Sequence, residues 1–403
     1  MATYNRGTIG TADINSARVV KDMSNDILLL DPKRTPFLVF SKKLRKEPTH
    51  NIKFSWQEDE VLGHRTAITT GEAVTLTAES ESAAIEVDNI DILTVGDMVL
   101  IEDSGVIAYV SDVEDTATNK IKIVPGFDSS NTATDITGGE ELQIIGNANE
   151  EGAGIRDENR RAVEDKSNYV QQFKTNFSMT DIQMATKTYS NKSEWGRLRY
   201  KKGIQHNEEI ERALLFGGQK KLTSSVIGGS HSTTTTKGAF QFIESNVETV
   251  GSSTALTETA WNEFLKDKAF DHGSDKKTLL ASKTLAHQIS TWASDSVRIE
   301  PGRNKRFGVN VDSYISTLGY ELDVIVHPFL EGNKYGQAGM VLDMDAIKLR
   351  TLKGNGKDFD TKLLVDVVND GAHKQIDEYF TVAGLQLEQE KRHAAIFNTL
   401  DNS

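Results

Sequence analysis

The feature that most constrains this chain is the stretch Ser167–Gly218, which joins a strand pattern to a long helix pattern. Three aromatic residues and a methionine recur at odd positions within Asn168–Met179, so they share one face of an extended segment. A helix is predicted to begin at Asn191, with Glu194 at capping-box spacing, and to end at a glycine pair. The rest of the 403 residues must pack around this strand and helix, and their number suggests two or three domains.

The predicted helix carries its charges in an unusual order. Basic residues fill its first half and acidic residues its second, which is the reverse of what the helix dipole favours. Each misplaced exposed charge costs at most about 0.3–1 kcal/mol, so a solvated surface helix remains the simplest interpretation. The sharper hypothesis is that both charged halves contact neighbouring subunits. The candidate contact residues on this helix are Arg197, Arg199, Lys201, Lys202, Glu208, Glu209 and Glu211.

The composition argues against several classes of function. The formal net charge of -13 disfavours a nucleic-acid-binding surface, which needs a basic face. The absence of cysteine excludes disulfide scaffolds, thiol catalysis and cysteine-ligated zinc. No apolar run approaches the roughly 20 residues that span a membrane, and the N-terminus has no apolar signal core. We therefore expect a soluble protein that is made inside the cell.

The N-terminal residues 1–48 are predicted to form an arm. An amphipathic segment at 12–30 is followed by Pro32 and Pro36. Each proline fixes its own φ angle and pushes its predecessor toward an extended conformation, so a stiff bend is expected at this point.

A long excursion is predicted to follow the arm. It begins with a strand pattern at 51–57, where Ile52, Phe54 and Trp56 alternate with polar residues. The predicted antiparallel partner of this strand is Asn168–Met179, which lies more than a hundred residues later. The polar stretches between the two strands are therefore expected to run out from the body of the protein and back.

Residues 83–147, inside this excursion, are richer in apolar β-type residues than the polar stretches on either side. Five short β-type runs, separated by turn residues at roughly ten-residue spacing, predict a small barrel or sandwich. The flanks, 58–82 and 148–166, are polar and loop-like, so residues 83–147 are interpreted as a domain inserted at a loop tip. The predicted strands are 84–87, 98–101, 106–110, 120–124 and 141–145.

The second half of the chain mixes helices and strands. A Ser/Thr-rich loop at 219–238 separates it from the long helix, and the end, 393–400, is apolar. Strict strand–helix alternation is missing, which favours an α+β domain over a doubly wound sheet. Helices are predicted at 257–270 and 282–292, and strands at 320–326, 340–342, 347–352, 363–368 and 378–387.

No motif in the sequence carries recognisable catalytic chemistry. The nine histidines are scattered, and Ser230 beside His231 lies in a low-complexity loop without a nucleophile elbow. Asp343 and Asp345 could hold a hard cation, but a capping or turn aspartate after a strand is the favoured interpretation. The sequence at 354–357 lacks the spacing of a phosphate loop. No catalytic, cofactor-binding or metal-binding residue is assigned, no cofactor is expected, and an enzyme is not expected; a hydrolase that uses either aspartate is the weakest alternative.

The order of these parts resembles the major capsid protein of tailed bacteriophages, which has the Hong Kong ninety-seven-type fold. The resemblance covers most of the chain outside 83–147, and its motifs are short. They are Leu30-Asp-Pro-x-x-Thr-Pro-Phe37, Asn168-Tyr-Val-Gln-Gln-Phe173, Glu211-Arg-Ala-Leu-Leu-Phe-Gly217, Val311-Asp-Ser-Tyr314 with Leu318-Gly319, Met340-Val-Leu-Asp343, Glu378-Tyr379 and His393-Ala-Ala-Ile396.

The resemblance implies an α+β capsid fold with a definite order of parts. The inserted β domain is a departure from the minimal fold. The implied parts are an N-terminal arm (1–48), a two-stranded E-loop (49–82 and 148–178), the inserted domain (83–147), a P-domain (179–237, spine helix about 191–217), an A-domain (238–345) and a return through P-domain strands (346–403).

The function implied is self-assembly into hexamers and pentamers of an icosahedral head that encloses double-stranded DNA without sequence-specific binding. The implied location is the virion, assembled in the host cytoplasm, with portal and scaffolding proteins as partners and no membrane. Further contact candidates are Trp56, Arg160 and Arg161. The alternative is a β-rich virion or cell-surface adhesion protein with 83–147 as its ligand module.

Overall fold

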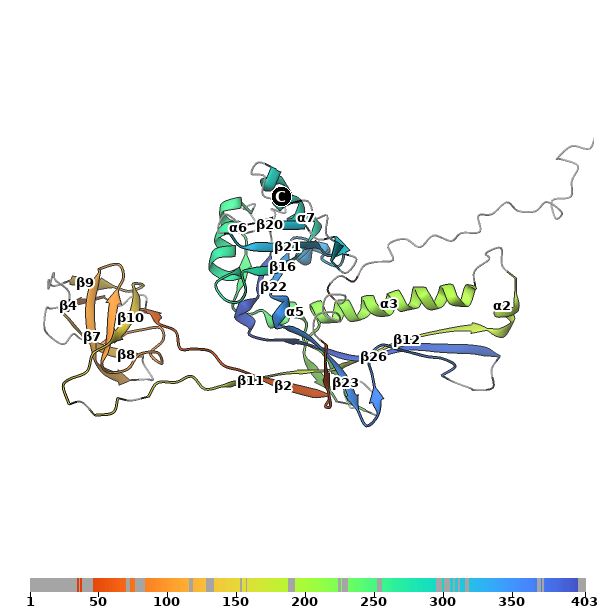
Figure 1. The fold of residues 1–403 in the computed structure, drawn as a ribbon, viewed down its shortest axis with the longest axis horizontal. Coiled ribbons are helices and arrows are strands. Elements are labelled where there is room, and N and C mark those ends of the chain that lie inside the picture. The colour runs from red at the N-terminus through yellow and green to blue at the C-terminus, as the bar shows by residue number, and fades with distance from the viewer. Residues whose placement is uncertain are drawn as a thin grey trace, which may run out of the picture. The chain divides into compact units, whose positions relative to one another are not determined.

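The computed structural model divides the chain into two compact units, Gln57–Lys166 and the remainder (Figure 1). Of the predicted arm, only 35, 37 and 46–48 are described, so the bend at Pro32 and Pro36 lies outside the described residues. The structure describes residues 35, 37, 46–69, 73–76, 84–115, 119–127, 134–152, 154–156, 158–187, 193–223, 226, 231–251, 256–294, 299–300, 305–306, 309–310, 312–315, 319–367, 371 and 373–397.

A six-stranded sheet forms the elongated part of the larger unit. Its longest pairing joins β12 to β26 antiparallel, from Gln171 opposite Ala383 to Thr180 opposite Lys374. The strand order is β1 (Lys46–Thr49), β23 (Ile347–Gly354), β26 (Lys374–Leu387) and β12 (Gln171–Thr180), with β24 (Lys357–Asp358) paired to β23 and β25 (Lys362–Leu364) paired to β26.

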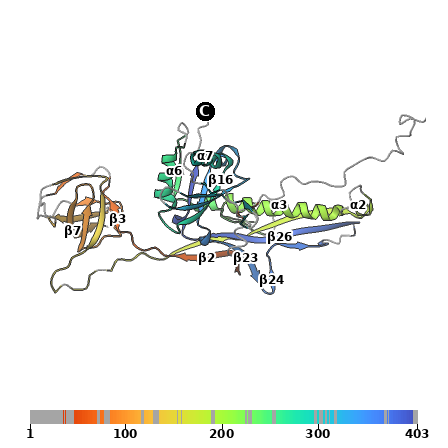
Figure 2. The same cartoon turned by 45° about the horizontal axis from the view of Figure 1, so that its top comes forward.

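The long helix α3 (Glu194–Phe216) lies along β12 and β26 in both views (Figure 1, Figure 2). Its N-cap is Ser193, whose hydroxyl accepts from the Gly196 amide, and Gly217 ends it. The predicted start at Asn191 falls outside the described residues, and with Ser193 as the cap, the proposed capping box at Asn191 is wrong. Phe173 and Phe177 of β12 are buried on alternate positions, as the period-two pattern predicted, whereas Tyr169 and Met179, predicted to share their face, are only partly buried. The short helix α2 (Asp181–Ala185) follows β12.

The predicted pairing of the two excursion strands is only partly right. The strand β2 (Lys53–Glu58) pairs with β11 (Glu164–Tyr169), whereas most of the predicted partner is β12, which pairs with β26 instead. Phe54 and Trp56 are buried, but Ile52 precedes β2 and is 56% exposed. Alternation identifies which residues form a strand, but it does not identify the partner.

A seven-stranded mixed sheet is the other large sheet of this unit. Its centre is β16, which is parallel to β21 and antiparallel to β22. The order is β15 (Val247–Thr249), β27 (Ala394–Phe397), β22 (Gly339–Leu342), β16 (Lys276–Ala281), β21 (Glu321–Val326), β20 (Asp312–Ile315) and β17 (Ile299–Glu300). Helix α6 (Glu258–Phe264), continued by a π-helical turn at Leu265–Ala269, and α7 (Lys283–Ser294) confirm the two predicted helices.

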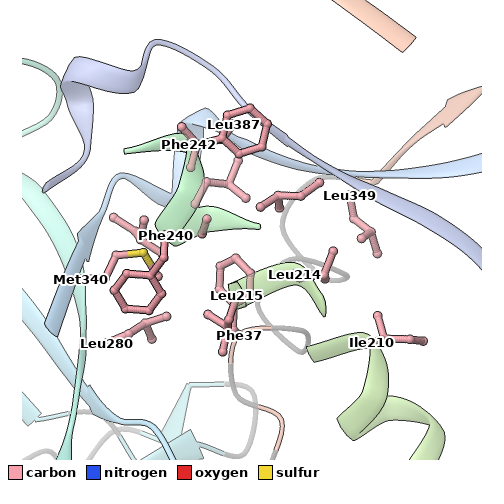
Figure 3. Packing of buried hydrophobic residues seen from close by; sticks show 14 of the residues in the cluster. Phe37, Ile210, Leu214, Leu215, Phe240, Phe242, Leu280, Met340, Leu349 and Leu387 are labelled. Carbon is pink, nitrogen blue, oxygen red and sulfur yellow. The ribbon is translucent and has the colours of Figure 1, made fainter. Parts of the chain in front are cut away.

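One apolar cluster joins α3 to both sheets of the larger unit. Its buried members include Leu214 and Leu215 of α3, Phe240 of α5 (Ala239–Phe242) and Met340 of β22 (Figure 3). A second cluster fills the space between the seven-stranded sheet, α6 and α7. The short elements around these cores are β13 (Lys220–Leu222), β14 (Thr233–Thr235), β18 (Lys305–Arg306), β19 (Val309–Asn310), α8 (Gly332–Tyr335) and 3-10 turns at Met344–Ala346 and Glu390–Arg392.

The unit Gln57–Lys166 is built around a closed antiparallel barrel. All five predicted strands are present, and β3 and β4, from a stretch predicted to be loop, pair with β10 and β9. A bridge between Ile68 and Val87 joins the two ends of the six-stranded sheet. The barrel order is β3 (Arg65–Ala67), β10 (Glu141–Asn147), β6 (Asp97–Ile101), β7 (Val106–Asp115), β8 (Lys120–Pro125) and β5 (Ile85–Glu86), with β4 (Ala73–Leu76) and β9 (Thr134–Thr137) as a separate pair.

Candidate functional site

Polar contacts hold the N-terminal half of α3 against the sheet. The Arg199 guanidinium donates two hydrogen bonds, of 2.9 and 2.5 Å, to one carboxylate oxygen of the fully buried Asp377. The Tyr379 hydroxyl donates to the Arg199 carbonyl at 3.2 Å. A Cβ added at Gly203 would lie 3.1 Å from that hydroxyl, so the glycine allows the close approach of helix and strand. Arg199 therefore contacts its own chain.

Further along α3, a buried histidine makes additional polar contacts between the helix and the sheet. The two ring nitrogens of His206 lie 2.8 Å from the hydroxyl oxygens of Thr175 on β12 and Thr381 on β26. Thr175 also donates to a carboxylate oxygen of Glu209 at 3.0 Å. One imidazole thus ties the helix to both long strands, although no sequence pattern singled it out.

Two of the predicted contact candidates are wrong because their side chains lie inside the chain's own core. Glu211 is 0% exposed, and its carboxylate lies 2.7 Å from His327 Nε2. Trp56 is buried and packs against Phe54 and Phe242, with ring centroids 6.0 Å apart in each pair. Neither side chain is available to a neighbouring subunit.

The other helix candidates differ in how much charge they present to solvent. Arg197 pairs with Glu194 one turn earlier, and this hydrogen bond raises the pKa of Arg197 and lowers that of Glu194. Glu208 lies 3.9 Å from Arg212 on the next turn. Lys201 is exposed, and Lys202 and Glu209 are partly exposed.

Arg160 and Arg161 lie in the smaller unit and are exposed. Arg161 pairs with Glu60 and with Glu164, the latter at 3.1 Å. Hydrogen bonds from Lys166 and then Arg161 lower the pKa of Glu164. These charges therefore cross-link the outgoing and returning stretches of the excursion next to β2 and β11.

Lys277 is a buried cation in the central strand β16. Its Nζ donates to the carbonyl oxygens of Ala269, His272 and Arg392 at 2.6, 2.6 and 2.7 Å. Burial lowers the pKa of Lys277 to about 8, against the opposing attraction of Asp343. The ammonium group thus joins two backbone segments, 269–272 and the residues around Arg392, which indicates a structural role in this unit.

Asp343 caps a turn, as the sequence interpretation favoured. Its side chain accepts from the Asp345 amide at 3.1 Å and pairs with Arg392 at 2.6 Å. Burial opposes ionisation of Asp343, but the hydrogen bond and charge of Arg392, together with two backbone amides, lower its pKa overall. The aspartate is therefore held by protein donors.

The other residues considered for catalysis or ligand binding either have a structural role or lie outside the described residues. The segment at 354–357 is the hairpin turn between β23 and β24, with Asn355 and Gly356 at φ angles of 50° and 73°. Ser230 lies outside the described residues, and His231 is exposed. Within the described residues, no cluster of three or more His, Asp or Glu side chains could ligate a metal ion. The described helices include none with the length and apolarity needed to cross a membrane.

Asn168 fixes the point at which the excursion returns to the larger unit. Its side-chain amide donates to Leu385 O at 2.7 Å, Thr236 Oγ1 at 3.0 Å and Lys237 O at 3.3 Å. Its side-chain oxygen accepts from the Tyr169 and Lys237 amides, both at 2.8 Å. One fully buried side chain therefore joins β11, β26 and the residues that follow β14.

Replacing Asn168 with alanine is expected to lower the free energy of unfolding by about 2 kcal/mol, because several buried backbone groups lose their partner. Asn176→Ala, on the exposed face of β12, is the control and should change stability by less than about 0.5 kcal/mol. Urea unfolding of both variants measures the difference. Equal effects at the two positions would contradict this role.

Comparison with known proteins decides the family. The sequence matches the family described as SU10 major capsid protein over residues 2–400. The chain belongs to this family. It is therefore a building block of a phage capsid and a structural component of the virion, and the comparisons lend no support to the adhesion alternative.

Solved structures share the fold of this capsid protein at low sequence identity. A chain of Mycobacterium phage Bobi is 10% identical, with a TM-score of 0.50, and the match covers 98% of this chain and 100% of that chain. A chain from the capsid of a native GTA particle is 8% identical, with a TM-score of 0.50 and coverage of 96% and 97%. Comparison with curated proteins finds no match.

Proposed function

We propose that copies of this capsid protein assemble into hexamers and pentamers of an icosahedral head that encloses double-stranded DNA. The observation that carries the proposal is membership of the major capsid protein family over nearly the whole chain. Assembly of the head in the host cytoplasm, together with portal and scaffolding proteins, belongs to the same proposal. The net charge of -13 suits a container that does not adhere to its DNA.

We assign the sheets and helices of the structure to the parts of the capsid fold. The six-stranded sheet with α3 as spine helix corresponds to the P-domain, and the seven-stranded sheet with α6 and α7 to the A-domain. The E-loop, predicted to end at 178, is assigned the shorter range 49–82 and 148–170, because β12 belongs to the six-stranded sheet, and the closed barrel is an insertion within this loop. Because β3 and β4 pair with strands of the insertion, we assign the inserted domain a wider range than 83–147. The presence of two separate sheets of six and seven strands in the larger unit supports these assignments.

The surfaces proposed to contact neighbouring copies combine exposed charge with isolated apolar side chains. On α3 they are the outward residues Arg197, Lys201 and Lys202. In the smaller unit, Arg160 and Arg161 are accompanied by Val61, Ile155 and Val163, whose exposed fractions are 92%, 104% and 51%. Many weak contacts of this kind can hold a shell, because each subunit makes several of them at once.

Negative-stain electron microscopy of the purified protein tests the proposed function. We expect capsomers or closed shells on the grid, and we expect the same sample to sediment faster than a monomer. A protein that stays strictly monomeric at high concentration, with no particles on the grid, would sink the proposal.

Reversing the charge of Arg197 is expected to reduce the yield of shells at least tenfold. The stability of the subunit should change by less than about 1 kcal/mol, because the pair with Glu194 is exposed. Sedimentation measures assembly, and urea unfolding measures stability. Lys266→Glu, an equal change of charge at an exposed residue beyond α6, is the control and should leave the yield unchanged. An Arg197→Glu variant that assembles as well as the control would remove this residue from the contact surface.

A further inference from the structure

A carboxylate sits without exposure at the point where α3 meets the apolar cluster. Glu211 and His327 are both 0% exposed, and the neighbouring helix residues Ile210, Leu214 and Leu215 are equally buried. Transferring a carboxylate out of water costs several kcal/mol unless good hydrogen bonds compensate, so an apolar residue would often be as stable at such a site. Stability alone therefore does not explain why a carboxylate occupies this position.

The hydrogen bonds of Glu211 identify the groups it organises. His327 Nδ1 accepts from the Phe329 amide at 3.2 Å, so the neutral ring carries its proton on Nε2. That Nε2–H donates to Glu211 Oε1 at 2.7 Å, and the Phe37 amide donates to the same oxygen at 2.8 Å. Three segments far apart in the sequence therefore meet at one carboxylate oxygen.

Phe37 is held in the core by its ring as well as by its amide. The ring is 0% exposed and belongs to the same apolar cluster as Leu214, Leu215 and Phe240 (Figure 3). The preceding residue, Pro36, has no backbone N–H, so it could not make the amide contact that Phe37 makes.

We propose that the buried Glu211–His327 pair is a latch whose role is to hold Phe37 in the core, and not to stabilise the body of the larger unit. The carboxylate accepts the amide of the same residue whose ring fills the cavity. Buried polar groups can specify one arrangement at some cost in stability, and the same logic applies here.

The latch concerns folding within one chain, so it goes beyond assembly and stands whether or not shells form. Hydrogen–deuterium exchange of fragments that contain the Phe37 amide measures seating directly. In the double variant Glu211→Met/His327→Leu, we expect exchange at Phe37 to rise at least a hundredfold, while the amides of α3 remain protected. Unchanged protection at Phe37 in the folded double variant would overturn the proposal.

A variant that preserves side-chain size keeps the test decisive if the double variant does not fold. Glu211→Gln retains an acceptor oxygen but loses the negative charge, so exchange at Phe37 should rise about tenfold, as expected when a charge-assisted hydrogen bond becomes a neutral one. No rise with Gln at this position would equally count against the latch.

Glu208→Met, on the same helix but outside this cluster, is the control and should leave exchange at Phe37 unchanged. A rise equal to that in the Glu211 variants would show that the effect belongs to the helix and not to the carboxylate.

Discussion

Arg199→Ala is expected to lower the free energy of unfolding by about 3 kcal/mol, because it leaves the buried carboxylate of Asp377 without its cationic partner. Asp377 is 0% exposed, and its other donors among the described residues are neutral, namely the Asp366 amide at 3.1 Å and the Gln375 side chain at 3.1 Å. These bonds satisfy its hydrogen-bonding capacity in part, but they do not balance its charge. Urea unfolding of the unassembled subunit measures the loss.

Arg197→Ala is the matched control for this prediction. Arg197 lies two residues away on the same helix, but its partner Glu194 is on the surface, so the change should cost less than about 1 kcal/mol. The double variant Arg199→Ala/Asp377→Asn should recover part of the lost stability, since the buried charge is then removed with its partner. If the two arginines cost the same, the buried pair does not anchor the helix.

Acidification from pH 6.5 to pH 3 is expected to destabilise the fold by up to about 5 kcal/mol through His393 alone. Burial lowers the pKa of His393 from 6.5 to about 3; the Asp343 carboxylate opposes this shift and the Lys277 ammonium adds to it. The ring is 0% exposed, and its Nδ1 accepts from the Asp343 amide at 3.2 Å, which requires the neutral form.

The sign follows from proton uptake on unfolding. Below pH 6.5 the unfolded chain binds a proton at His393, whereas the folded chain does not bind it until about pH 3. The stability that the neutral His393 contributes is therefore fully present above pH 6.5 and is lost as the pH falls toward 3. His393→Gln should flatten this part of the profile of unfolding free energy against pH. His231→Gln, at an exposed position, should leave the profile unchanged. A profile equally steep in both variants would assign the acid sensitivity to other groups.

Local periodicity made much of the fold predictable. The alternating pattern of β12 identified its buried face, with Phe173 and Phe177 inward, because successive side chains of any strand point to opposite sides. The five barrel strands were found because each is a short run of strand-favouring residues bounded by turn residues. Such signals lie within ten residues of sequence and need no knowledge of the partner.

Features that depend on distant partners were not predictable. The strand β16 was missed because it begins with Lys276 and Lys277, yet the second lysine is buried against two carbonyl groups of the stretch just before the strand and one, that of Arg392, from far along the chain. Glu208, Glu209 and Glu211 look equivalent in the sequence, but only the last is fully buried. The side of a helix that meets the core can be read only when its apolar stripe is continuous, and polar contacts interrupt the stripe of α3.

The closure of the barrel has a consequence for any particle that carries it. Ile68 and Val87 bridge the first and last strands of the six-stranded sheet, and the Thr69 and Asp88 amides donate across the same seam at 2.9 Å each. An open strand edge is a template for pairing with strands of other molecules. A shell would carry such an edge on every subunit, so that even weak strand pairing between subunits of different shells could aggregate whole particles. By joining its own ends, this barrel can be displayed in many copies while its backbone hydrogen bonds stay occupied within each subunit.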